Sequence, residues 1–133
     1  MVIDSSALIA VLFDEPETAD FVVAIANAPS RFLSASSYLE TAIVMMGRLG
    51  PNSLESVDHL LDELSIEVMP FTREQAALAI AAYRQFGKGS GHAAGLNFGD
   101  CFSYALAKLT GEPLLFKGDD FSYTDLAPAV RTP

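Results

Sequence analysis

Cysteine, basic residues and long apolar runs are all scarce in this sequence. Its one cysteine, Cys101, excludes an internal disulfide and the usual cysteine-rich zinc sites. No apolar run approaches the ~20 residues that a membrane-spanning helix needs. The N-terminal residues MVIDSS lack the basic region of a cleavable signal. We therefore expect a cytoplasmic, soluble protein without a membrane partner.

Positive charge is also in short supply. The chain has 8 Lys and Arg residues against 17 Asp and Glu residues, a net charge of −9. This balance argues against passive binding of nucleic acid through a broad basic surface. It favours a basic partner, or multivalent cations held by clustered carboxylates. Acidity also aids solubility, so the charge alone does not decide between these explanations.

The hydrophobic pattern predicts one folded domain over residues 1–133, because half of the residues are hydrophobic and 133 residues can bury a core. Short apolar runs predict strands at residues 1–4, 31–35, 66–71 and 113–116. Helical spacing predicts helices at residues 7–13, 17–27, 37–49, 54–64, 73–86 and 99–110. Strands that alternate with helices predict an α/β fold, with a parallel sheet between two helical layers.

Acidic residues follow three of the four predicted strands. A further acidic residue begins the helix that precedes the fourth strand. Asp4 ends the first strand, Glu40 lies in the first turn after the second, and Asp100 begins the helix that follows a Gly-rich loop. Asp119 and Asp120 follow the last strand. Functional groups of an open parallel sheet gather at the carboxyl ends of its strands. We therefore expect these carboxylates to converge.

Each acidic residue also has a purely structural interpretation. Asp4 and Asp100 are suited to cap helices, and Glu40 forms a capping-box pattern with Ser37. The residues GDD are typical of a turn. The joint placement favours function, because clustered carboxylates repel one another and resist ionisation.

A divalent cation relieves this repulsion, and oxygen ligands select Mg²⁺, with Mn²⁺ as a possible substitute. We expect Asp4 and Asp100 to be the main metal ligands. Glu40 and Asp119 would complete a second position or orient a water molecule. Such a site suits phosphodiester cleavage, in which the metal activates water and stabilises the leaving oxygen. Between Asp119 and Asp120 the sequence gives no firm choice, and we take Asp119.

Four segments carry a family resemblance: MVIDSSALIAVLFDEPE, Glu40 after a strand and SAS, GLNFGDCFSYALAK, and PLLFKGDDFSYTDL. From residue 1 to about residue 126 the chain resembles the PIN-domain ribonucleases of the VapC toxin type. The resemblance implies a three-layer α/β/α sandwich and Mg²⁺-dependent endoribonuclease activity on structured RNA such as tRNA. It also implies a homodimer and neutralisation by a VapB-like antitoxin.

The resemblance carries over residue by residue. It implies acidic site residues at Asp4, Glu40 and Asp100, and a nearby hydroxyl at Ser6. Position 5 departs mildly from the family, because Ser5 stands where Thr is common. Since the chain is acidic, we expect a basic antitoxin segment, in which an arginine occupies the acidic pocket as the metal does.

Other classes remain open on the sequence alone. An aspartyl-phosphate phosphatase could use Asp4 as its nucleophile, but phosphatases of the haloacid dehalogenase type usually carry a second Asp where this chain has Ser6. A non-catalytic partner-binding domain would not need the acids to converge. A metal-free ribonuclease needs an acid and a base, and no spacing pairs the two histidines. We expect Cys101 to pack in the core.

Overall fold

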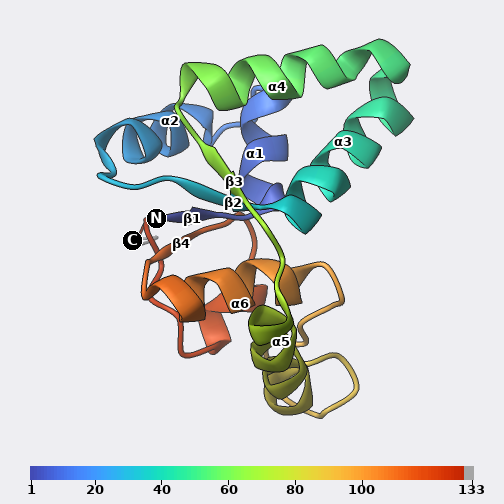
Figure 1. Cartoon of the computed structure of the whole chain (residues 1–133), viewed down its shortest axis with the longest axis vertical. Helices are drawn as coiled ribbons and strands as arrows, with labels where there is room; N and C mark the ends of the chain where they lie inside the picture. Colours follow the sequence, from blue (N-terminus) through green and yellow to red (C-terminus); the bar gives the residue numbers. More distant parts are fainter. Residues whose placement is uncertain (131–133) are drawn as a thin grey trace.

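The central element is an all-parallel sheet. The computed structural model describes residues 1–130, and its strands follow the order β3-β2-β1-β4 (Figure 1). The strands are β1 (Val2–Ile3), β2 (Phe32–Ser34), β3 (Glu67–Met69) and β4 (Leu114–Leu115). In register, Val2 faces Phe32 on one side and Leu114 on the other. The predicted parallel sheet is confirmed.

Helices cover both faces of the sheet, as Figure 1 shows. One layer contains α1 (Ser5–Leu12), α2 (Thr18–Asn27), α3 (Ala35–Leu49) and α4 (Leu54–Glu63). The other contains α5 (Arg73–Phe86) and α6 (Asp100–Thr110). Two short 3₁₀ helices, η1 (Pro51–Ser53) and η2 (Asp120–Tyr123), complete the described chain. The three-layer α/β/α arrangement is therefore confirmed.

Strands β1 and β4 are buried on both faces, which explains their apolar sequences, whereas the edge strand β3 is largely exposed. Ile3 and Leu115 pack into the core beneath α1, α2 and α4, together with Leu8 and Ile25. Their neighbours Val2 and Leu114 pack into the core beneath α5 and α6. Because successive side chains of a strand point to opposite faces of the sheet, the two-residue strands β1 and β4 each contribute one side chain to each core. Of the helices that the structure describes, none is both long and apolar enough to cross a membrane.

Local sequence accounts for several helix ends. The hydroxyl of Thr72 accepts a hydrogen bond from the Gln75 N–H at 3.2 Å at the start of α5. At the end of α6, Gly111 adopts a left-handed conformation with φ +70°. Asp4 caps α1, which is the structural role that the sequence suggested for this residue.

The predicted capping box of Ser37 and Glu40 is wrong. Helix α3 begins at Ala35, so Ser37 already lies inside the helix. Its hydroxyl is buried against Ser103 of α6 at 3.2 Å. Glu40 contacts Ser5 of α1. Contacts with other elements, and not the local cap, therefore determine where both side chains lie.

The strand order creates a switch point beside β1. The chain runs outward from β1 to β2 and β3 with its connecting helices in one layer. It then returns through α5 and α6 in the other layer and adds β4 on the opposite side of β1. Ligands of open α/β sheets bind outside the carboxyl ends of the strands at such a point. The fold therefore directs attention to the residues that follow β1 and β4.

Candidate active site

Asp4 lies at the carboxyl end of β1, and only 3% of its surface is exposed. Its Oδ2 accepts a hydrogen bond from the Ser6 N–H at 3.0 Å, which caps α1. Its Oδ1 accepts a hydrogen bond from the Ser103 hydroxyl at 2.6 Å. Two donors therefore hold the carboxylate in one orientation. Asp4 is both a helix cap and a candidate site residue.

Two serines that follow Asp4 hold other parts of the site. The Ser5 hydroxyl donates a hydrogen bond to Oε1 of Glu40 and so joins α1 to α3. The Ser6 hydroxyl accepts a hydrogen bond from the Lys117 N–H at 3.0 Å and so fixes the loop after β4. The short sequence IDSS thus connects β1 to two segments that lie far away in the chain.

Asp100 stands at the start of α6 and forms a reciprocal pair with Asn97. The Asn97 N–H donates to Asp100 Oδ2 at 3.0 Å, and the Asp100 N–H donates to Asn97 Oδ1 at 2.9 Å. The Asn97 side chain therefore satisfies a free N–H at the helix start, and the Asp100 carboxylate accepts the Asn97 N–H in return. Asp100 thus takes part in a reciprocal cap with Asn97 and does not cap the helix alone.

A cavity of about 260 Å³ brings the acidic residues together. Asp4 reaches it from β1, Glu40 from α3 and Asp100 from α6, so three predicted site residues converge as expected. The residues that line the cavity are Asp4, Ser5, Ser6, Ile9, Glu40, Asn97, Asp100, Lys117, Asp120 and Phe121.

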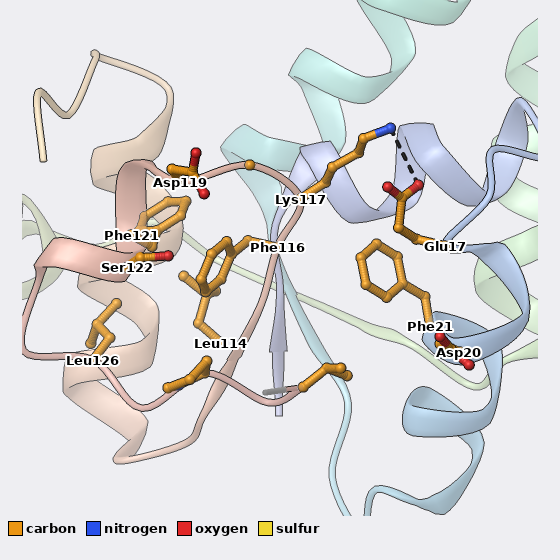
Figure 2. A pocket seen from close by; sticks show the side chains of 13 residues that line it. Glu17, Asp20, Phe21, Leu114, Phe116, Lys117, Asp119, Phe121, Ser122 and Leu126 are labelled. Carbon is orange, nitrogen blue, oxygen red and sulfur yellow. Dashed lines mark ion pairs between the residues drawn. The ribbon is translucent and has the colours of Figure 1, made fainter. Parts of the chain in front are cut away.

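The fourth acid in this cavity is Asp120, not Asp119. Asp119 lines a neighbouring cavity of about 780 Å³ (Figure 2), beside Phe121 and Ser122. Helix η2 begins at Asp120, and the chain turns between the two aspartates, so their side chains reach different cavities. The structure therefore replaces our choice of Asp119 with Asp120.

Burial and neighbouring negative charge both act on the carboxylates of the site. Burial, together with repulsion from the Asp4 and Asp120 carboxylates, raises the pKa of Asp100 to about 7, although the Asn97 N–H opposes this shift. Among the described residues that line the cavity, Lys117 is the one cation, and its Nζ is paired with Glu15 and Glu17 (Figure 2 shows the pair with Glu17). A bound cation would offset the negative charge of these carboxylates.

The donor set fits a hard divalent cation. The acidic side chains that line the cavity offer carboxylate oxygens, which are the ligands that Mg²⁺ and Mn²⁺ prefer. Within residues 1–130, no group of three or more Asp, Glu, His or Cys side chains is arranged closely enough to surround one ion. Mg²⁺ needs only one or two carboxylates, because it keeps several of its water molecules. Asp4 and Asp100 would supply these carboxylates.

The alternative nucleophiles and bases do not reach the cavity. Cys101 is buried, its thiol donates to the Asn97 carbonyl at 3.4 Å, and burial raises the pKa of the thiol. It therefore packs in the structure, as predicted. His59 pairs with Glu63 on the exposed face of α4, and His92 packs against the Phe86 ring. Neither histidine lines the cavity.

Comparison with known families identifies the fold and its chemistry. The sequence model described as the PIN domain matches residues 1–126. The chain belongs to the PIN-domain family. Over 130 residues it is 52% identical to ribonuclease VapC28 of Mycobacterium tuberculosis, and the match covers 98% of each chain. Over 127 residues it is 51% identical to ribonuclease VapC of Mycolicibacterium smegmatis, covering 96% of this chain and 98% of the relative.

A solved structure supports the same assignment at the level of the fold. The crystal structure of VapC20 of Mycobacterium tuberculosis, described as a toxin that cleaves the sarcin–ricin loop, superposes with a TM-score of 0.76. The match covers 98% of both chains at 16% sequence identity. Together with the close relatives, the PIN-domain match makes this chain a ribonuclease of the VapC type. The phosphatase and binding-domain alternatives are thereby set aside.

Several residues of the site were not found from the sequence. Asn97 had a detectable signal, since Asn three residues before Asp is a recognisable helix-start pattern. Ser103, Gly99 and Lys117 had none, because their importance depends on residues more than 50 positions away in the chain. Arg84 and Lys88 are basic residues four positions apart where α5 leads into the Gly-rich loop, and they line neither of the two cavities described here.

Proposed function

We propose that this VapC-type ribonuclease is a Mg²⁺-dependent endoribonuclease toxin that cleaves structured RNA such as tRNA. The observation that carries the proposal is the convergence of Asp4, Glu40, Asp100 and Asp120 in one cavity at the switch point of the sheet. An RNA phosphate would be repelled by this cavity unless a cation compensated the carboxylates. The choice of tRNA rests on the family resemblance.

The chain's own residues have distinct roles in this proposal. Asp4 and Asp100 hold the cation, one fixed by Ser103 and Ser6, the other by Asn97. Glu40 and Asp120 orient the attacking water by accepting hydrogen bonds from it, and Ser5 holds Glu40 in place. The bound cation supplies Lewis acidity at the scissile phosphate and lowers the pKa of the attacking water.

The same cavity supports the proposed antitoxin partner. VapC toxins pair with VapB antitoxins, and a basic VapB-like segment is complementary to a chain of net charge −9. An arginine of that segment would place five N–H donors among carboxylates that lack a paired cation. Antitoxin binding and Mg²⁺ binding would then exclude one another. We place this chain and its antitoxin in the cytoplasm.

An exposed apolar stripe on α3 supports the proposed homodimer. Leu39, Ile43, Met46 and Leu49 follow helical spacing on one side of α3, and each is between 37% and 63% exposed. A second copy of the chain would cover this stripe. The variant Ile43→Glu should shift the protein to monomer in analytical ultracentrifugation. A variant that keeps the mass of the unmodified protein at every concentration would contradict the assignment.

The decisive experiment compares Asp4→Asn and Asp100→Asn with the control Asp62→Asn, an exposed aspartate on α4. Asn caps helices as well as Asp and keeps an acceptor oxygen, so both site variants should fold. We expect cleavage of total RNA in Mg²⁺ to be lost in both site variants and kept in the control. Cleaved ends should be mapped after brief expression in cells. Normal cleavage by a folded Asp100→Asn protein would overturn the site assignment.

Chelation tests the metal separately. EDTA should abolish cleavage by the unmodified chain, and added Mg²⁺ or Mn²⁺ should restore it. Activity that persists in EDTA would contradict metal dependence and favour acid–base catalysis by side chains. Release of phosphate from small esters would instead favour the phosphatase class.

A further inference from the structure

A buried serine lies directly behind Asp4. Ser103 has no exposed surface, and its hydroxyl donates to Asp4 Oδ1 at 2.6 Å. The hydroxyl of Ser37, only 1% exposed, lies 3.2 Å from that of Ser103. The three side chains therefore form a chain of buried polar groups that joins α3, α6 and β1.

The chemistry of the hydroxyl group fixes the direction of these two hydrogen bonds. A serine has one O–H to donate and two lone pairs that accept. Because Asp4 is a carboxylate, the Ser103 hydroxyl must donate to it. The hydroxyl of Ser37 must then donate to Ser103. Ser37 therefore donates to Ser103, and Ser103 donates to Asp4, so both hydrogen bonds support the Asp4 carboxylate.

Ser103 has no evident structural reason to be serine. It lies inside α6 beside apolar residues that are fully buried, among them Ala105 and Leu106. Alanine is a better helix former, and it would not bury a hydroxyl. A buried polar group in a helix interior is kept when its hydrogen bond matters. Here that bond goes to Asp4.

The position of Ser103 on α6 gives the bond its meaning. Ser103 follows Asp100 by three residues, so both lie on the same side of the helix. Helix α6 thus carries one proposed metal ligand, Asp100, and through Ser103 it also holds the other, Asp4. Any shift of α6 moves Asp100 and the hydrogen bond to Asp4 together.

We propose that Ser103, supported by Ser37, is a positioning residue that holds the Asp4 carboxylate in the orientation needed to bind a divalent cation jointly with Asp100. This rests on the proposed metal-dependent function. With one oxygen held by Ser103 and the other by the Ser6 N–H, the carboxylate cannot rotate away from the cavity. Partners that orient metal ligands in this way typically contribute 10–100-fold to metal affinity or activity.

The test measures Mg²⁺ affinity of the full chain by titration calorimetry without RNA, alongside kcat and KM for RNA cleavage. Ser103→Ala should weaken Mg²⁺ binding by roughly tenfold or more and lower kcat more than it changes KM. Ser103→Thr keeps the hydroxyl and should restore affinity to within about threefold. Ser37→Ala leaves the donor to Asp4 in place, so its effect should be smaller than that of Ser103→Ala.

The control is Ser53→Ala, which removes another buried serine hydroxyl whose bond goes to the Gly50 carbonyl at 2.7 Å. It should leave Mg²⁺ affinity unchanged. Folding of every variant is checked by circular dichroism and thermal melting. If Ser103→Ala does not fold, Ser103→Cys repeats the measurement with a side chain of similar shape and a much weaker donor.

The outcomes separate this proposal from the proposed function. If the unmodified chain binds neither Mg²⁺ nor Mn²⁺, the proposed metal dependence is overturned, and the proposed role of Ser103 is overturned with it. If the unmodified chain binds Mg²⁺ and folded Ser103→Ala or Ser103→Cys binds it equally well, only the role of Ser103 is overturned. Loss of affinity with rescue by Ser103→Thr supports it.

Discussion

The backbone of Gly99 lies against the carboxylate of Glu40. A Cβ atom built on Gly99 would overlap Glu40 Oε2, so any side chain at position 99 would force the Glu40 carboxylate to move. The φ angle of Gly99 is −63°, which any residue adopts, so the space and not the backbone conformation requires glycine here. Gly99 therefore sets how closely Glu40 approaches the residue that follows it, Asp100.

Gly99→Ala should displace Glu40 and reduce RNA cleavage. A shift of about 1 Å in a catalytic group can cost roughly 100-fold in rate, and we expect a loss of at least tenfold in kcat/KM. The measurement is steady-state cleavage of a defined RNA in Mg²⁺. Because the overlap involves the end of a flexible side chain, the variant should fold.

A matched control for this substitution is available in the same helix as Glu40. Gly47 lies inside α3, and a Cβ atom there meets nothing within 4 Å. Gly47→Ala should raise the free energy of unfolding by about 1 kcal/mol through helix propensity and leave cleavage unchanged. Equal activities of the Gly99 and Gly47 variants would show that Gly99 does not position Glu40.

The two adjacent aspartates after β4 offer a direct test of the cavity assignment. Asp120 lines the carboxylate cavity and Asp119 lines its neighbour. Asp120→Asn should reduce cleavage at least tenfold, since the proposed role of Asp120 in orienting water needs its charge. Asp119→Asn should cleave RNA at nearly the unmodified rate. The reverse ranking would restore Asp119 to the site.

The elements of the fold could be predicted because their signals are local. Apolar runs such as PLLF and the heptad-like spacing of residues 54–64 depend only on near neighbours in the chain. The parallel sheet followed from the alternation of these elements. Asp4, Glu40 and Asp100 could be found as well, since each lies next to the end of a strand or the start of a helix.

The remaining features of the site depend on packing between distant segments. Ser103 is 99 residues from Asp4, and Ser5 is 35 residues from Glu40. No pattern in the sequence states that these pairs meet. The Ser37 capping box was wrong for the same reason, because burial against Ser103 outweighs a local cap. Asp119 and Asp120 are adjacent, and only the start of η2 decides which one faces the cavity.

The raised pKa of Asp100 predicts that Mg²⁺ binding strengthens with pH. With a pKa of about 7, Asp100 is mostly protonated at pH 6 and mostly ionised at pH 8. A carboxylate must lose its proton to bind a metal, so affinity should rise about tenfold over this range. Calorimetry at pH 6 in buffers of different ionisation enthalpy should detect the release of about one proton. A pH-independent affinity would contradict Asp100 as a ligand.

The same shift predicts an unusual effect of Asp100→Asn on stability. In the unfolded chain Asp100 has its ordinary pKa of about 3.9, whereas in the metal-free folded chain the pKa is about 7. Between these values the folded state holds a proton that the unfolded state has lost. The contribution of Asp100 to stability is therefore full below about pH 4 and is lost as the pH rises through 7. Asparagine does not ionise and avoids this loss.

We therefore expect Asp100→Asn to melt at a higher temperature than the unmodified chain at pH 8 in EDTA, with a much smaller difference at pH 5. The partial exposure of Asp100 reduces the effect, and we expect a difference of several degrees. The exposed control Asp62→Asn should show no such dependence on pH. Thermal melts of the three proteins at both pH values test the prediction. A difference that is the same at pH 5 and pH 8 would show that Asp100 ionises normally in the folded chain, and the repulsion from Asp4 and Asp120 would then be too weak to require a cation.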